Sequence, residues 1–215
     1  MKQYDAYLFD WDGTTAQTLA MWLSIQRATM DAYGIHVTDK ELVRKVFGRA
    51  RPGLIELGIP EADLSEVFRQ WGAKAQAGIV DVPLYPHFAD VIKTLQRRSK
   101  KLGLITATAR PTIERALDAH SLHGVFSTIT AGGEAPDKPN PAGILQALEK
   151  LGVTKSRAVM LGDSEKDIQA AHNAGIDSVL FYPPEHELFH HLDDLQAYGP
   201  THTIHSWQEL LDQLQ

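Results

Sequence analysis

The sequence predicts an α/β protein with a doubly wound, mostly parallel sheet and a small helical cap domain inserted after the first strand. Three observations lead to this fold class. Short apolar runs alternate with helical patterns along most of the 215 residues, as in parallel strands joined by helices. One interval, 16–83, is much longer than an ordinary crossover and is helical throughout. Acidic residues stand at the ends of two of the apolar runs, directly after Phe9 and two positions after Leu161, and strand ends in open α/β sheets bind ligands.

The individual elements follow from the spacing of the apolar residues. Short apolar runs predict buried strands at Ala6–Phe9, Leu102–Thr106, Thr128–Ala131, Ala158–Leu161, Ser178–Tyr182 and Thr203–Ile204. Helical spacing predicts helices at Phe88–Arg98, Thr112–His120, Ala142–Leu151, Glu165–Ala174 and Trp207–Leu214. Gly175 follows one of these patterns and is expected to cap that helix.

The long interval between the first two strands predicts a second domain. Apolar residues recur at helical spacing from Leu19 to Tyr33, and helical stretches continue through Lys40–Phe47 and Ala62–Gly78. The chain returns through a segment with two prolines, which stiffen a hinge. We therefore expect a helical cap domain at 16–83 and an α/β core domain made of 1–15 and 84–215.

Composition excludes several classes of function. The formal net charge is −6 with both signs interspersed, whereas nucleic-acid binding needs a basic face. The absence of cysteine excludes disulfides, thiolate catalysis and cysteine metal sites. The sequence has neither a secretory pattern nor an apolar run of the roughly 20 residues that a membrane helix needs. We expect a cytoplasmic protein that acts on a small molecule, with no nucleic-acid or membrane partner.

The most informative residues are two acids, Asp10 and Asp12, that end the first apolar run. Burying two like charges is costly, so a cation and a reacting group are expected between them. One carboxylate can then attack a substrate while the other transfers protons. Three more polar clusters fall at or just after predicted strand ends: Thr106, Asp137-Lys138-Pro139-Asn140-Pro141 and Gly162-Asp163-Ser164-Glu165-Lys166-Asp167.

These four clusters, in this order, resemble the motifs of the haloacid dehalogenase (HAD) superfamily, and the resemblance covers nearly the whole chain. The segment 16–83 resembles the helical cap of the phosphoglycolate phosphatase and β-phosphoglucomutase subgroup. The resemblance implies a Mg²⁺-dependent phosphatase that hydrolyses a small phosphomonoester metabolite, such as phosphoglycolate, through an aspartyl-phosphate intermediate.

The resemblance also implies a role for each acid of the site. Asp10 would be the nucleophile, and Asp12 would be the general acid and base. Mg²⁺ would be bound by the carboxylates of Asp10 and Asp163 and by the backbone carbonyl of Asp12, since hard cations prefer oxygen ligands. Asp167 would hold Lys138 or a metal-bound water from a second layer, although its sequence position alone is equally compatible with a surface helix charge.

Three residues are implied to bind the phosphoryl group. Thr106 would donate a hydrogen bond to it, and the backbone N–H of Ala107 would add another. Lys138 would neutralise both the nucleophile and the phosphate. Without the other motifs, Thr106 is also compatible with an ordinary β-branched strand residue, and Lys138 with a solvated loop lysine.

Neighbouring chemistries are distinguished by single residues. Asp12 argues against dehalogenation, which has no alkoxide to protonate. It also argues against phosphonoacetaldehyde hydrolysis, where alanine stands at this position and a cap lysine is needed. Two alternatives stay open: intramolecular phosphoryl transfer of the phosphoglucomutase type, and a non-catalytic metabolite-binding protein that keeps the fold.

Substrate specificity and histidine chemistry are the least defined parts of the prediction. Arg49 and Arg51 follow Gly48 in the cap and are candidates for binding a carboxylate or a second phosphate, or for a solvated face. His186 and His190 have the i,i+4 spacing of some zinc sites, but a solvated surface helix explains this spacing better.

Overall fold

The computed structural model describes residues 2–214 and contains a single six-stranded parallel sheet in the order β3-β2-β1-β4-β5-β6. Its strands are β1 (Ala6–Phe9), β2 (Lys101–Ala109), β3 (Thr128–Gly132), β4 (Ala158–Gly162), β5 (Asp177–Phe181) and β6 (His202–Ile204). The strand order reverses between β1 and β4, which is where doubly wound sheets bind their ligands. The predicted fold class is confirmed.

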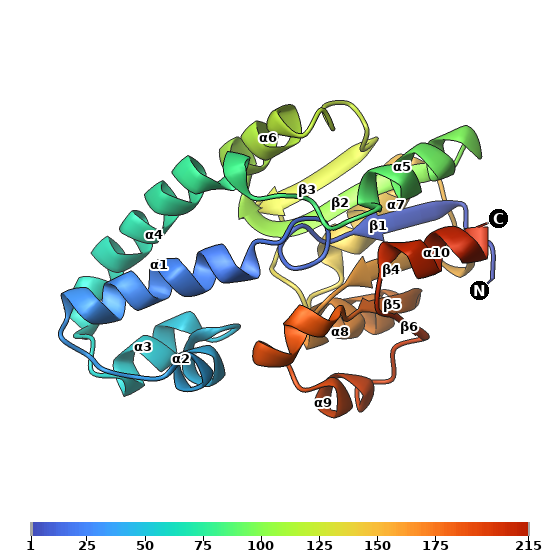
Figure 1. Ribbon diagram of the computed structural model, residues 1–215. Coiled ribbons are helices and arrows are strands. Elements are labelled where there is room, and N and C mark those ends of the chain that lie inside the picture. The colour runs from blue at the N-terminus through green and yellow to red at the C-terminus, as the bar shows by residue number, and fades with distance from the viewer. Residues whose placement is uncertain (1, 215) are drawn as a thin grey trace.

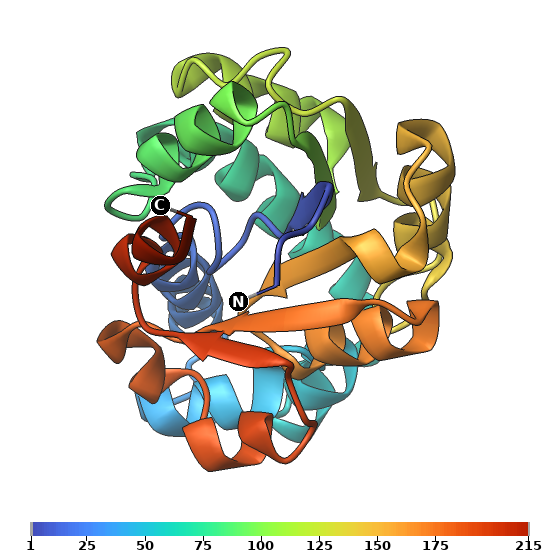
Figure 2. The same cartoon turned by 90° about the vertical axis from the view of Figure 1, so that its right-hand side faces the viewer.

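Helices cover both faces of the sheet, as Figure 2 shows. One face carries α5 (Phe88–Arg97), α6 (Arg110–Ala119) and α10 (Trp207–Leu214). The other carries α7 (Ala142–Leu151) and α8 (Glu165–Ala174). Between β5 and β6 the chain forms a 3₁₀ turn at Pro184–Leu188 and the short helix α9 (Leu192–Gln196).

The period-two alternation of the strands explains the two cores. In β1, Tyr7 and Phe9 pack into the cluster under α5, α6 and α10, while Ala6 and Leu8 pack into the cluster under α7 and α8. Strand β1 is therefore buried on both faces, which accounts for its uninterrupted apolar sequence. Trp207 stacks on Phe181 at a ring separation of 4.7 Å and anchors α10 to the sheet.

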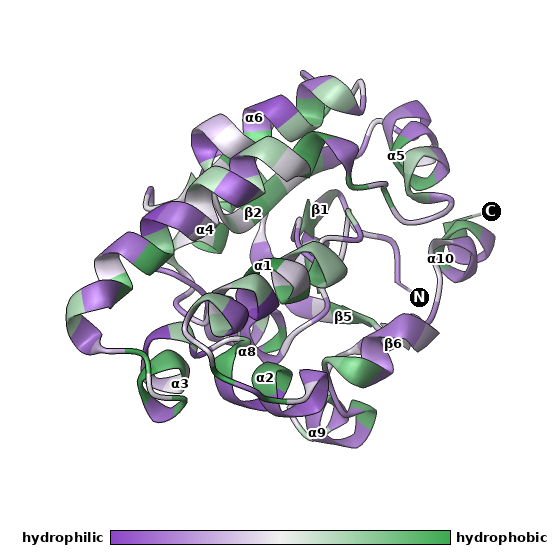
Figure 3. Cartoon of the chain, turned by 60° about the vertical axis from the view of Figure 1, so that its left-hand side comes forward, coloured by the Kyte–Doolittle hydropathy of each residue, from purple (hydrophilic) through white to green (hydrophobic). Residues whose placement is uncertain are grey.

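The chain segment between β1 and α5 forms a separate group of helices. This group lies to one side of the sheet in Figure 1. Its helices are α1 (Leu19–Ala32), α2 (Asp39–Val46), α3 (Ala50–Glu56) and α4 (Leu64–Gly78), with 3₁₀ turns at Glu61–Asp63 and Ile79–Asp81. They share their own apolar cluster, centred on Met30, Leu42, Leu54 and Trp71. Purple and green residues are mixed along α1 and α4 in Figure 3, as in amphipathic helices. The assignment of 16–83 as a functional cap domain remains a prediction.

A pair of glycine substitutions tests the packing of this helical group. A Cβ on Gly53 in α3 would overlap the backbone carbonyl of Lys45 in α2, so we expect Gly53→Ala to destabilise the protein by about 1–3 kcal/mol. Gly72 in α4 has open space around the same position, so Gly72→Ala should stabilise it by about 1 kcal/mol through helix propensity. Urea unfolding of both variants measures the difference, and equal effects would contradict the close approach of α2 and α3.

Candidate functional site

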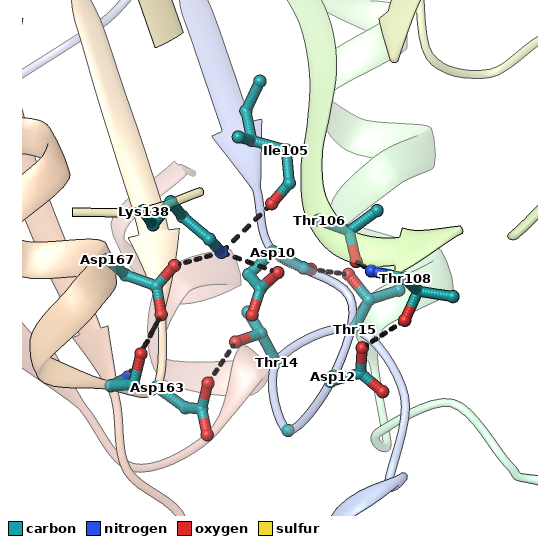
Figure 4. A network of polar contacts seen from close by, with 12 residues as sticks. Asp10, Asp12, Thr14, Thr15, Ile105, Thr106, Thr108, Lys138, Asp163 and Asp167 are labelled. Carbon is teal, nitrogen blue, oxygen red and sulfur yellow. Dashed lines mark hydrogen bonds and ion pairs between the residues drawn. The ribbon is translucent and has the colours of Figure 1, made fainter. Parts of the chain in front are cut away.

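The four polar clusters of the sequence meet at the carboxyl ends of the central strands (Figure 4). Asp10 follows β1 and Asp163 follows β4, and these two strands are hydrogen-bonded neighbours. Lys138 comes from the loop after β3, and Asp167 from the first turn of α8. The sheet topology therefore brings together residues that are up to 157 positions apart, from Asp10 to Asp167.

Lys138 is the centre of this cluster. Its Nζ lies 2.8 Å from Asp10 Oδ1 and 2.5 Å from Asp167 Oδ1, and it donates a hydrogen bond to Ile105 O at 3.1 Å. Its side chain is 11% exposed and that of Asp167 is 2% exposed. Neither residue is therefore a solvated surface charge, and Lys138 aligns Asp10 through charge-assisted hydrogen bonds.

Asp167 is fixed in place by the start of α8. Its Oδ2 accepts hydrogen bonds from the backbone N–H and the hydroxyl of Ser164, which caps the helix. A Cβ on Gly162 would overlap the Asp167 side chain, so a glycine is required at the end of β4. The same residue type is required at Gly13, where φ is +71° and a Cβ would lie 2.8 Å from Asp163 Cγ.

The electrostatics of the cluster favour a divalent cation. Carboxylate oxygens of Asp10, Asp163 and Asp167 lie within 4.8 Å of one another, and all three residues are buried. Lys138 is the only cation in ion-pair contact with Asp10 and Asp167 among residues 2–214, so negative charge is in excess. Buried oxygens with uncompensated charge are the ligands that Mg²⁺ prefers. The residues present therefore fit the predicted metal.

The pKa values reflect the same balance. Burial raises the pKa of Asp10 well above its usual range against the opposing effect of Lys138, and the carboxylates of Asp167, Asp163 and Asp12 raise it further. Burial also acts to raise the pKa of Asp163, but the hydrogen bond and charge of His190 leave it below its usual value. Burial lowers the pKa of Lys138, but Asp10 and Asp167 outweigh this effect and raise it. Lys138 therefore stays charged.

Thr106 and Ala107 lie beside this cluster, although β2 continues to Ala109 instead of ending at Thr106 as predicted. The strand is longer because its pairing with β3 resumes at Ala109 after a register shift. The Thr106 Oγ1 accepts a hydrogen bond from Thr108 N at 3.0 Å, which leaves the Thr106 hydroxyl hydrogen free to donate. Thr106, Ala107 and Lys138 line a common cavity of about 100 Å³.

Two residues that the sequence did not single out hold Asp12. Trp22 Nε1 in α1 donates to Asp12 Oδ1 at 2.8 Å, and Thr108 Oγ1 donates to Asp12 Oδ2 at 2.6 Å. Trp22 was assigned only to the apolar pattern of the cap. Its indole N–H requires a partner when it is partly buried, and Asp12 stands ten residues before it in the sequence.

Trp22→Phe tests whether this contact tunes a proton-transferring acid. Removing one hydrogen bond to a charged group should slow hydrolysis of an alkyl phosphate by about one to two orders of magnitude. A nitrophenyl phosphate should be affected much less, because its leaving group needs no proton. Trp71→Phe is the matched control, since Trp71 Nε1 donates to Thr29 within the helical group. Equal losses on both esters would contradict a role through Asp12.

Arg49 and Arg51 lie on the surface of the helical group. Arg49 Nη2 is 2.5 Å from Glu56 Oε1, and Arg51 Nη1 is 3.0 Å from Glu61 Oε1. The adjacent Gly48 does contact the core, because its carbonyl accepts a hydrogen bond from Lys166 Nζ at 2.8 Å. Substrate contacts by the two arginines stay a prediction.

The expectation for His186 and His190 was wrong. Instead of a solvated helix, the segment is a 3₁₀ turn, and His186 is completely buried with its Nε2 2.7 Å from the Tyr85 hydroxyl. His190 Nε2 lies 3.5 Å from Asp163 Oδ2. The spacing alone gave no sign of burial, because the covering residue, Tyr85, is 101 positions away.

Sequence comparison identifies the family. The profile of the family described as haloacid dehalogenase-like hydrolase matches residues 7–181. The phosphoglycolate phosphatase of Vibrio parahaemolyticus serotype O3:K6 is 29% identical over 99% of this chain and 97% of its own length. The enzyme of the same name from Escherichia coli O157:H7 is 30% identical over 66% of this chain, which covers 56% of that relative's length.

Solved structures share the fold. The structure of CbbY from Rhodobacter sphaeroides in complex with phosphate is 25% identical, with a TM-score of 0.78 and coverage of 97% of this chain and 96% of that one. A haloacid dehalogenase-like family hydrolase from Streptococcus pneumoniae has a TM-score of 0.80 over the full length of both chains at 24% identity. With the family profile covering most of its length and the four motifs joined in one buried cluster, this chain belongs to the haloacid dehalogenase-like hydrolase family.

Proposed function

We propose that this hydrolase is a Mg²⁺-dependent phosphatase that hydrolyses a small phosphomonoester metabolite through an aspartyl-phosphate. The observation that carries the proposal is the buried Lys138 bridging Asp10 and Asp167 beside the cavity that Thr106 and Ala107 line. A carboxylate held next to a permanent cation can approach a phosphoryl group that would otherwise repel it. The names of the relatives support a phosphoglycolate-like substrate.

Two carboxylates would divide the chemistry. In the first step an Asp10 oxygen forms a bond to phosphorus, the bond from phosphorus to the alcohol oxygen breaks, and Asp12 gives its proton to the leaving alkoxide. In the second step Asp12 takes a proton from water as the water oxygen attacks phosphorus, and the bond to Asp10 breaks to release phosphate. The contacts from Trp22 and Thr108 would keep Asp12 oriented through both transfers.

The remaining site residues would bind rather than react. Thr106 would donate its free hydroxyl hydrogen to a phosphoryl oxygen, and the Ala107 N–H would donate to another. Lys138 would stay charged beside both the nucleophile and the phosphate, held by Asp167. These groups offset negative charge on the phosphoryl oxygens before reaction begins.

The metal would complete this set. Asp10, Asp163 and the Asp12 backbone carbonyl would hold Mg²⁺, and Asp167 would support the site through Lys138. When bound, Mg²⁺ supplies a positive charge that stabilises the phosphoryl oxygens in the transition state.

The helical group 16–83 would act as a cap that limits substrate size. It already contacts the core beside the site, since Lys166 lines the same cavity as Thr106 and Ala107 and donates a hydrogen bond to Gly48 O. A closed cap excludes bulk water and large substrates, which favours metabolites over phosphoproteins. Arg49 and Arg51, at the same turn, are proposed to favour substrates with a second anionic group. A related structure, a mutant of CbbY, is in complex with xylulose-(1,5)bisphosphate.

A phosphate-release screen over a panel of metabolites, with and without Mg²⁺, tests the function. We expect release from a small phosphomonoester that depends on Mg²⁺, and no release from phosphoproteins. A hexose 1-phosphate in the panel also distinguishes hydrolysis from the alternative, intramolecular phosphoryl transfer of the phosphoglucomutase type. Isomerised sugar phosphate without free phosphate would replace the phosphatase proposal with a mutase that uses the same residues.

In residues 2–214 the structure contains no helix that is long and apolar enough to cross a membrane.

A further inference from the structure

The segment after β5 holds a histidine against the proposed metal site from outside the four sequence motifs. This segment, residues 183–191, contains the buried His186 and the partly buried His190, whose side chain is 17% exposed. His190 Nε2 lies 3.5 Å from Oδ2 of Asp163. The carboxylates whose oxygens cluster within 4.8 Å among residues 2–214 are Asp10, Asp163 and Asp167, so His190 stands behind the cluster rather than within it.

Three contacts fix the backbone that carries His190. The Tyr182 hydroxyl donates to His190 O at 2.7 Å, and His190 N donates to His186 O at 2.9 Å. His186 in turn packs between aromatic rings, including Phe181 and Tyr182, and its Nε2 meets the Tyr85 hydroxyl at 2.7 Å. These contacts anchor the backbone on which the His190 side chain stands.

The Asp163 carboxylate is contacted from two other parts of the chain, the loop after β1 and the segment 183–191. Thr14 Oγ1 reaches Oδ1 at 3.3 Å, and Gly13 packs so closely that any side chain there would strike the carboxylate. The other oxygen, Oδ2, has His190 as its ion-pair partner. Carboxylates that bind metals are commonly oriented by such hydrogen-bonding partners, and losing one partner typically weakens metal affinity by about 10- to 100-fold.

The contact between His190 and Asp163 is largely buried, since the two side chains are 17% and 5% exposed, and the segment that carries His190 packs against the helical group 16–83. Phe189, which precedes His190, packs against Phe47 at the end of α2 with ring centroids 5.2 Å apart. His190 also lines a cavity of about 530 Å³ together with Lys40, Val43 and Arg44 of the same helix. An ion pair that is shielded from water is less screened than an exposed one.

We propose that His190 is a positioning residue for metal binding, which donates its Nε2–H to Asp163 Oδ2 and holds the carboxylate in the orientation that receives the cation. The inference rests on the proposed function, because it assigns His190 to the same metal site. It adds a residue that none of the four motifs contains, on a segment anchored by His186 and Tyr85.

Direct binding of Mn²⁺ to the purified full chain tests this role without using activity. Free Mn²⁺ is measured by electron paramagnetic resonance during a titration of each variant. We expect His190→Ala to weaken Mn²⁺ binding about tenfold or more. His190→Gln should recover most of the affinity, because its amide N–H replaces the Nε2 donor. His191→Ala is the matched control, since His191 is exposed, lines the same cavity and should bind as wild type does.

Asp163→Asn is the reference variant for a metal site that has lost one of its carboxylates. It distinguishes the claim that the site binds a metal from the claim that His190 positions Asp163. If Asp163→Asn loses Mn²⁺ while His190→Ala and His190→Gln bind like wild type, the role of His190 is refuted and the proposed function stands. If wild-type protein itself does not bind Mn²⁺, the metal part of the proposed function fails and the inference fails with it. Circular dichroism establishes that each variant is folded. Should His190→Ala not fold, full Mn²⁺ affinity in a folded His190→Phe variant, which lacks the donor, would overturn the proposal.

Discussion

Replacing Asp10 with asparagine is expected to abolish phosphate release. Loss of a covalent nucleophile lowers kcat by on the order of four to six powers of ten in well-studied enzymes, which would put this variant at the detection limit. Asparagine has nearly the same shape as aspartate. The substitution also removes a carboxylate whose negative charge is disfavoured by burial, as the raised pKa of Asp10 shows. Lys138 keeps its ion pair with Asp167, so the variant should fold and unfold near the wild-type temperature.

The matched control is Asp90→Asn on the exposed face of α5. Asp90 is on the surface, where its carboxylate oxygens lie 3.9 Å from Lys93 Nζ and 3.6 Å from His87 Nδ1. Its neutralisation should leave kcat unchanged within a factor of about two, because exposed pairs contribute little. Undiminished turnover by Asp10→Asn, in protein purified free of other phosphatases, would refute the assignment of the nucleophile.

Removing divalent metal with a chelator is expected to have the second large effect. Activity should fall to background and return with Mg²⁺, but not with potassium chloride at the same ionic strength. Mg²⁺ should also raise the unfolding temperature, since a ligand at 100 times its Kd stabilises the folded state by about 2.7 kcal/mol. Asp163→Asn should lose both responses, because it removes one of the three clustered carboxylates.

The stabilisation of the folded protein by Mg²⁺ is expected to depend on pH in one direction. Burial and the neighbouring carboxylates raise the pKa of Asp10, so a proton competes with the cation for the same oxygens. The Mg²⁺ concentration needed for half-maximal stabilisation should therefore fall as pH rises through the raised pKa. Calorimetric scans at several pH values measure it, and a half-maximal concentration that rises with pH would contradict the assignment of Asp10 to the metal site.

The core helices could be located from the sequence because their ends carry local signals. Helix α7 ends where Gly152 adopts a left-handed conformation with φ of 61°, and α8 ends in the same way at Gly175 with φ of 75°. The start of α8 is set by the capping box of Ser164 and Asp167. Each signal lies within a few residues of the boundary, and the observed bounds of both helices match the predicted ones.

Where such local signals are absent, the sequence did not predict a helix, as for α3, or misplaced the end of a strand, as for β2. Helix α3 contains Pro52 and Gly53, which argue against a helix in isolation, but the packing of Gly53 on α2 stabilises it there. The end of β2 was placed too early at Thr106, because the alternation of small residues up to Ala109 carries no strong strand signal. Pairing with β3 extends the strand, and that pairing is not encoded locally.

The residues of the candidate site also differ in whether the sequence carries a signal for them. The proximity of Asp10, Lys138 and Asp163 could be predicted because motif order indicates where strand ends meet. The contacts of Trp22 and His190 could not, because each residue touches a carboxylate on a different element, and the contact exists only in the folded chain. Such contacts carry no motif of their own, so only the structure reveals them.

The most direct measurement of the account is a crystal structure of the protein grown with Mg²⁺ and beryllium fluoride, a mimic of the phosphoryl group. We expect a trifluoroberyllate bonded to an Oδ atom of Asp10, with Lys138 and Thr106 against its fluorine atoms. A mimic bound elsewhere while the Asp10 carboxylate stays unmodified would contradict the central claim that this carboxylate carries the phosphoryl group.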